Sequence, residues 1–243
     1  MKALRTTLVL ACAGLLFGST LSFAQTKEDD AVPGTDVGPN CDVGGYKTER
    51  IVYPAPMAIP DNVAGGITLG PLFMPPDGDI INDVVLELNA VHTWVGDLIL
   101  NLSYDPDCSG VQPAVSVRVL CRPRGASPDA RSPCGASTTT FGCSGDFVAA
   151  NAYLFSDDAV GPLGVGAGCT AAIAGGCYKQ SDQGGGSFSI WRGLPKGGCW
   201  YLNISDNAAA DLGAVNGWAI FIRNQRPVSA TDASWGEVKN IYR

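Results

Sequence analysis

Five segments of this 243-residue chain alternate apolar and polar side chains with a period of two. The alternation runs through residues 85–90, 98–103, 115–119, 200–205 and 218–223. Successive side chains of a β-strand point to opposite faces, so each segment is predicted to be a strand with one apolar face. Because no segment has a convincing helical period, we expect two antiparallel sheets packed on each other.

The composition supports an all-β fold. Charged residues make up 16% of the chain, which also contains 31 glycines and 16 prolines. Coiled coils and helical bundles need many Ala, Glu, Lys, Leu and Arg residues, and disordered acidic chains need few apolar ones, so these classes are excluded. Residues 122–186 are rich in Gly, Ser, Ala and Pro, which predicts long loops around one strand near residues 152–155.

The first 24 residues have the features of a secretory signal peptide. Residues 1–5 are basic, residues 6–17 are apolar, and the small residues Ser22 and Ala24 precede a cleavage point before Gln25. A competing lipoprotein cleavage at Cys12 would leave too short an apolar stretch. No other segment reaches the roughly 18 apolar residues of a membrane-spanning helix, so we expect a secreted protein without a membrane span.

Eight cysteines remain after removal of the signal peptide, and in an oxidising compartment they predict four disulfides. They are Cys41, Cys108, Cys121, Cys134, Cys143, Cys169, Cys177 and Cys199. The sequence leaves the connectivity open; short spacings favour Cys134–Cys143, Cys169–Cys177 and Cys108–Cys121, which leaves Cys41–Cys199. A metal site built on these cysteines is disfavoured, because there is no Cys-x-x-Cys pair and only one histidine.

The mature chain divides into three parts. Residues 25–58 are polar and interrupted by Gly and Pro, which predicts an extended arm held by Cys41. Residues 59–224 carry the strand pattern and predict one domain. For residues 225–243 two interpretations stay open, a short amphipathic turn that docks on the domain or a C-terminal sorting tag.

The charge of the chain limits its partners. The net charge is −7, and it becomes −9 when Lys2 and Arg5 leave with the signal peptide. Phosphate backbones repel such a surface and no run of Lys or Arg offsets it, so nucleic acid is not an expected partner.

Four blocks of sequence resemble one known family. They are residues 59–62, residues 92–98 with His92, Trp94 and Gly96, residues 155–159, and residues 198–207 with Trp200, followed by residues 211–213 and Trp218. Together they resemble the P domain, or Homo B domain, which follows the catalytic domain in subtilisin-like proprotein convertases such as kexin and furin and in many bacterial secreted proteases. The resemblance covers about residues 59–224. It implies a jelly-roll β-sandwich, here with long disulfide-stapled loops.

The sequence contains no motif of a catalytic domain, and we expect a protein that is not an enzyme. His92 is the only histidine, so every Ser-His-Asp or Cys-His arrangement would need it. In the P-domain pattern the matching histidine packs with its neighbours. We therefore expect a structural role for His92.

Five aspartates are candidates for a calcium site: Asp97, Asp157, Asp158, Asp206 and Asp211. They lie at strand ends or in loops of the matched blocks, where distant parts of the chain can meet. Carboxylates held together need a compensating cation, and Ca²⁺ prefers six to eight oxygen ligands. The resemblance to bacterial P domains also implies calcium. The alternative is that Asp97 and Asp206 accept hydrogen bonds from turn N–H groups.

These observations predict a secreted, non-catalytic module, stabilised by disulfides and calcium. It would bind a partner protein such as a subtilisin-like serine protease or a cell-surface component. The alternative is a calcium-dependent carbohydrate-binding or adhesion protein of the jelly-roll type, in which exposed Trp191 and Tyr178 would stack on sugars.

Overall fold

The computed structural model describes residues 25–28, 41, 43, 44, 46–110, 115–123, 143–163, 169, 172–180 and 186–225, and of residues 25–28 and 225 only the backbone. The signal peptide, Cys134 and the tail after residue 225 lie outside these residues, so the predictions made for them stay predictions. No helix within the described ranges is long and apolar enough to cross a membrane.

The described residues form ten strands and two short 3₁₀ helices, so the predicted all-β class is confirmed. The strands are β1 (Gln25–Glu28), β2 (Lys47–Ile59), β3 (Val63–Met74), β4 (Ile80–His92), β5 (Leu98–Asp105), β6 (Val115–Cys121), β7 (Tyr153–Phe155), β8 (Gly176–Tyr178), β9 (Gly198–Asp206) and β10 (Gly213–Gln225). The 3₁₀ helices are η1 (Val95–Asp97) and η2 (Phe188–Trp191).

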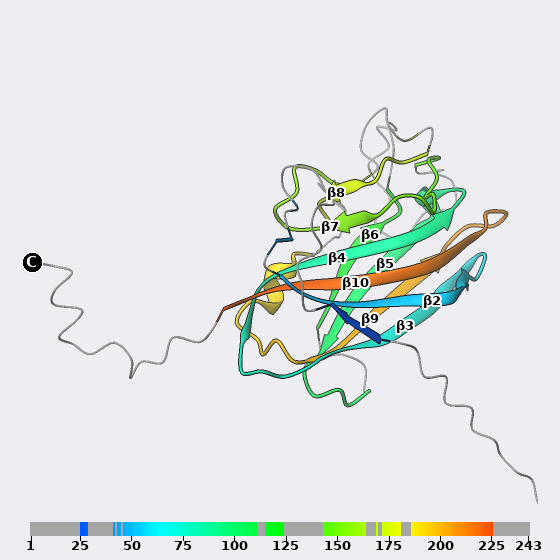
Figure 1. Ribbon diagram of the computed structural model, residues 1–243. Helices are drawn as coiled ribbons and strands as arrows, with labels where there is room; N and C mark the ends of the chain where they lie inside the picture. Colours follow the sequence, from blue (N-terminus) through cyan, green and yellow to red (C-terminus); the bar gives the residue numbers. More distant parts are fainter. Residues whose placement is uncertain are drawn as a thin grey trace, which may run out of the picture.

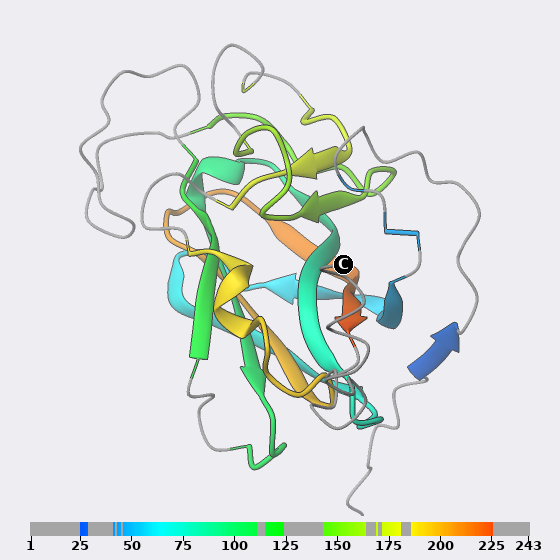
Figure 2. The same cartoon turned by 90° about the vertical axis from the view of Figure 1, so that its left-hand side faces the viewer.

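The strands form two sheets that pack face to face (Figures 1 and 2). The six-stranded sheet has the order β1-β2-β10-β4-β7-β8 and the four-stranded sheet the order β3-β9-β5-β6. All pairs are antiparallel except β7 with β8. The orders β2-β10-β4-β7 and β3-β9-β5-β6, with the chain passing between the sheets, are those of a jelly roll. The predicted β-sandwich is therefore confirmed.

The core lies between the sheets and uses the apolar faces that the sequence predicted. Leu86 and Leu88 of β4 and Ile220 of β10 come from one sheet, and Leu100 of β5 and Leu202 of β9 from the other, all fully buried. Trp200 and Trp218, two residues of the family motif, are also buried in this core. Full burial of each aliphatic side chain contributes roughly 1.5–3 kcal/mol, which explains why the alternation specifies the sheets.

The sandwich begins before the predicted boundary at Ile59. Strand β2 pairs with β10 from Lys47 opposite Ile222 to Ile59 opposite Gly213, so residues 47–58 belong to the six-stranded sheet and not to an arm. A register shift separates Met57 from Val52, and two prolines lie between them. Proline and bulges break the period of two, which is why the sequence pattern did not reveal this strand.

The preferred disulfide pairings were wrong. The structure joins Cys41 to Cys177, Cys108 to Cys199 and Cys143 to Cys169. Cys121 is also disulfide-bonded, and its partner lies outside the described residues. The argument from short spacing failed because strand register decides which cysteines meet. Cys41, which was expected to hold an arm of residues 25–58, attaches the segment before β2 to Cys177.

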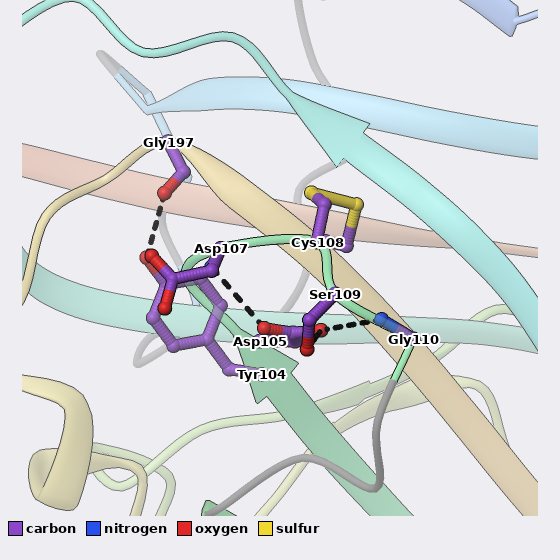
Figure 3. The surroundings of a disulfide bond; sticks show 8 residues. Tyr104, Asp105, Asp107, Cys108, Ser109, Gly110 and Gly197 are labelled. Atoms are coloured by element: carbon purple, nitrogen blue, oxygen red, sulfur yellow. Dashed lines mark hydrogen bonds between the residues drawn. A yellow bond between two sulfur atoms is a disulfide. The ribbon is translucent and has the colours of Figure 1, made fainter.

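The Cys108–Cys199 disulfide illustrates this control by register. Asp105, at the end of β5, lies opposite Cys199 of β9, and the chain then turns back so that Cys108 reaches it (Figure 3). The buried Asp105 carboxylate holds the turn by accepting hydrogen bonds from the N–H groups of Asp107 and Gly110, both at 3.1 Å. Asp105 was not among the predicted site residues.

Candidate functional site

Three of the four family-like blocks meet at one end of the sandwich, which we call the His92 end. It contains the β2–β3 turn at residues 60–62, the segment 93–97 after β4, and the β9–β10 connection at residues 207–212, at the right of Figure 1. Hydrogen bonds join these segments, from Thr93 N to Leu212 O at 3.3 Å and from Asn207 N to Asp97 O at 2.9 Å. The jelly-roll order thus brings distant parts of the sequence together.

His92 forms a buried pair with Asp206. The two side chains are 0% and 1% exposed, and His92 Nε2 lies 3.2 Å from Asp206 Oδ2. His92 Nδ1 accepts a hydrogen bond from Trp94 N at 3.1 Å, so in the neutral ring Nε2 carries the proton and donates it to Asp206. The second carboxylate oxygen of Asp206 accepts from Ala208 N. The ring is enclosed and both of its nitrogens are hydrogen-bonded, as expected for a histidine with a structural role.

Gly213 makes this enclosure sterically feasible. A Cβ atom at this position would lie 2.3 Å from His92 Cδ2 and 2.7 Å from the carbonyl oxygen of Val91. Any larger residue would displace the histidine ring, so the glycine of the block 211–213 has a packing role.

Asp97 is paired with Arg122. The Arg122 guanidinium donates from Nη2 to Asp97 Oδ1 and from Nε to Gly96 O, both at 3.1 Å. Burial raises the pKa of the Asp97 carboxyl, Arg122 lowers it, and the neighbouring charges of Asp206 and Asp211 raise it further. The net direction is upward, because desolvation of this 4% exposed residue outweighs the guanidinium.

The five predicted calcium ligands fall into two groups. Asp97, Asp206 and Asp211 lie at the His92 end, where Asp211 accepts a hydrogen bond from the Thr93 hydroxyl at 2.8 Å. Asp157 and Asp158 follow β7 at the other end. There, Asp157 accepts hydrogen bonds from Phe188 N at 3.0 Å, Ser189 N at 2.9 Å and the Ser187 hydroxyl at 2.7 Å, and so holds the start of η2. Asp158 is exposed.

The described carboxylates are not grouped as a calcium site, and calcium binding stays a prediction. Within the described part of the chain, no three His, Cys, Asp or Glu side chains are grouped so that they could hold a metal. Oxygens of Asp97, Asp157 and Asp206 already accept hydrogen bonds from a guanidinium, backbone N–H groups and an imidazole. A calcium site needs such oxygens for the ion. The alternative given for Asp206, a bond from a turn N–H group, is present.

Exposed apolar side chains at the His92 end were missed by the sequence reasoning. Leu212, in the β9–β10 connection, is 71% exposed, and Val63, at the start of β3, is 45% exposed. Both lie beside carboxylates, Leu212 next to Asp211 and Val63 two residues after the exposed Asp61. Leu212 lies in the connection just before β10, outside the alternating segments, so the sequence pattern gave no sign of its exposure.

Of the two aromatic residues proposed for sugar stacking, Trp191 is not available for it. Trp191 is 0% exposed and lies in the core, where its ring centre is 5.5 Å from that of Phe188 and 5.0 Å from that of Trp200. Tyr178 is half-buried, and its hydroxyl donates to Ala174 O. The prediction of an exposed Trp191 was wrong, because η2 turns its apolar side into the sandwich.

A scan against models of protein families and a search of curated proteins found no match. The resemblance to the P domain therefore rests on the four sequence blocks, and the jelly roll agrees with it at the level of the fold only.

Proposed function

We propose that this protein is a secreted, non-catalytic module that binds a partner protein through its His92 end. The partner that the sequence blocks favour is the catalytic domain of a subtilisin-like serine protease. Secretion is supported by the signal-like N-terminus and by disulfides, which persist in oxidising compartments.

One contrast at the His92 end carries the proposal. His92, Asp97 and Asp206 are buried and hydrogen-bonded to protein groups, so they hold the loops in place and are closed to a substrate. Leu212 and Val63 are exposed on the same end. Exposed apolar surface rimmed by polar residues marks interaction sites, and a few residues of an interface supply most of its binding energy.

The charge around these side chains selects the chemistry of the partner. Asp61 is exposed and Asp211 half-exposed, whereas Arg122 is engaged with Asp97. A protein surface with basic residues around an apolar pocket complements this end. Its association should slow as salt screens the charges.

The experiment uses the full-length mature chain and a purified subtilisin-like catalytic domain that has no P domain of its own. We expect saturable binding by calorimetry and a longer half-life of protease activity when the chain is present. A fluorogenic peptide assay of the chain alone should show no hydrolysis. Absence of binding would overturn the proposal that a subtilisin-like catalytic domain is the partner. Hydrolysis by the chain alone would overturn the proposed non-catalytic role.

A further inference from the structure

A short segment before β2 crosses the outer face of the six-stranded sheet. We call it the strap and define it by its described residues Cys41, Val43, Gly44 and Tyr46. Its first residue is bonded to Cys177 of β8, and its last leads into β2. Because β8 and β2 lie on opposite sides of β10, β4 and β7 in the sheet order, the strap spans these three strands.

The strap covers an apolar patch that points away from the main core. The patch consists of Val85, Leu154, Ala219 and Phe221, all buried, with Val43 and Tyr46 packed against it. Val85 and Phe221 are opposite each other on β4 and β10, and their neighbours Leu86 and Ile220 face the main core. Ala152 and Cys177 also pack against the patch, and without the strap it would lose the cover of Val43 and Tyr46.

Polar contacts fasten the strap at its β2 end. The Tyr46 hydroxyl donates to Asp83 Oδ2 at 2.6 Å, and Arg223 lies 5.4 Å from the centre of the Tyr46 ring. Arg223 also contacts Asp83 at 3.4 Å. Val43 and Tyr46 are further joined by a backbone hydrogen bond of 3.0 Å. At the opposite end, the disulfide is the covalent attachment.

The strap and the sandwich have separate apolar clusters. The main cluster of buried residues between the sheets includes none of the described strap residues. Strands β4 and β10 are paired along their length independently of the strap. Local opening of such a satellite cluster requires much less free energy than global unfolding.

We propose that the Cys41–Cys177 disulfide is a redox-sensitive latch whose reduction releases the strap and exposes the patch. Cys177 is half-buried whereas Cys41 is buried, so Cys177 is the cysteine that a dithiol reductant would attack. A thiolate of the dithiol attacks Cys177 Sγ and the Cys41 thiolate leaves. The second thiolate of the dithiol then releases Cys177. Two electrons and two protons pass to the two cysteines, and the dithiol becomes a disulfide.

The other described disulfides provide internal references. Cys143 and Cys169 are both buried, so their bond should resist reduction for longer. Cys108 is exposed and can be reduced, but its bond joins β9 to the β5 turn, far from the strap. Its reduction should leave the patch covered.

The test is a graded reduction of the full-length protein with dithiothreitol. Free thiols are alkylated and assigned by mass spectrometry, while dye binding reports exposed apolar surface and circular dichroism reports the sheets. We expect Cys41 and Cys177 to be alkylated before Cys143 and Cys169. Dye fluorescence should rise several-fold over the same range of dithiothreitol, with the sheet signal intact.

Paired variants separate the latch from the other bonds. The double variant Cys41→Ser/Cys177→Ser should bind dye without any reductant, and the control Cys108→Ser/Cys199→Ser should bind dye only after reduction. Loss of the sheet signal together with the Cys41–Cys177 bond, or no rise in dye binding after its reduction, would overturn the latch. The wild-type series decides the matter if a variant does not fold.

Discussion

The polar side chains of the His92 end satisfy one another in the interior. Asp206 accepts from His92 and from Ala208 N, and Asp97 accepts from Arg122. A buried carboxylate is tolerated only with such donors. Removing one partner of such a pair would therefore leave the other buried without its hydrogen bond. A structural role for His92 was expected from the P-domain pattern, in which the matching histidine packs with its neighbours. The sequence could not identify Asp206 as the partner, because 114 positions separate the two residues.

Replacing His92 should therefore cost stability. In His92→Leu, the Asp206 carboxylate loses its imidazole donor inside the protein, and breaking a buried pair costs about 3 kcal/mol or more. Urea unfolding followed by fluorescence measures the loss. The control Thr93→Val removes the hydroxyl that donates to Asp211 at the surface and should cost about 1 kcal/mol or less. Equal losses in the two variants would contradict the assignment.

The raised pKa of Asp97 predicts how the stability of the protein depends on pH. Burial raises its pKa above the ordinary value of 3.8, so the folded state keeps this proton to a higher pH than the unfolded chain does. The stability that this carboxyl contributes therefore falls as the pH rises through that window. Asp97→Asn cannot titrate. The unfolding free energy of wild type relative to Asp97→Asn should decline as the pH rises above the ordinary pKa of 3.8 and through the raised pKa of Asp97. A constant or rising difference would show that the pKa is not raised.

At the scale of elements, the predictions were best where a strand has one buried face. Residues 85–90, 98–103, 115–119, 200–205 and 218–223 lie within β4, β5, β6, β9 and β10, and the expected strand near residues 152–155 is β7. Strand β2 was missed because two prolines and a register shift interrupt its alternation. Trp191 was misplaced because a 3₁₀ turn, whose sequence signal is weak, directs it inward.

The 3₁₀ helix η2 depends on a carboxylate from a distant loop. The Asp157 carboxylate accepts hydrogen bonds from two N–H groups in the first turn of η2, those of Phe188 and Ser189. Asp157→Ala should lower the unfolding free energy by about 1–2 kcal/mol, as loss of a helix cap does. The exposed neighbour Asp158 serves as the control, and Asp158→Ala should change stability by less than about 0.5 kcal/mol. A loss from Asp158→Ala as large as that from Asp157→Ala would contradict this role of Asp157.

For the whole molecule, the jelly roll was predictable and the cross-links were not. The apolar faces specify which side of each strand is buried, and the four sequence blocks implied the order of the strands. Disulfides depend on register and on loop paths, which side-chain alternation does not encode; Cys41 and Cys177 are 136 residues apart. The exposed Leu212 was hidden for the same reason, since a loop residue has no periodic pattern to interpret.

Calcium can be tested on the intact protein. Because Asp97, Asp157 and Asp211 accept hydrogen bonds from protein donors, we expect the melting temperature to be the same with and without a calcium chelator. A fall of the melting temperature on chelation, reversed by added calcium, would show that the predicted calcium is bound after all.

The most direct test of the proposed function maps the docking surface on the folded protein. Leu212→Asp places a charge on the exposed leucine of the His92 end, and Val160→Asp makes the same kind of change at an 83% exposed valine in the β7–β8 segment. Calorimetric titration with the subtilisin-like catalytic domain should show binding at least about tenfold weaker for Leu212→Asp, or ~1.4 kcal/mol, and unchanged for Val160→Asp. Equal affinities of the two variants would contradict docking through the His92 end.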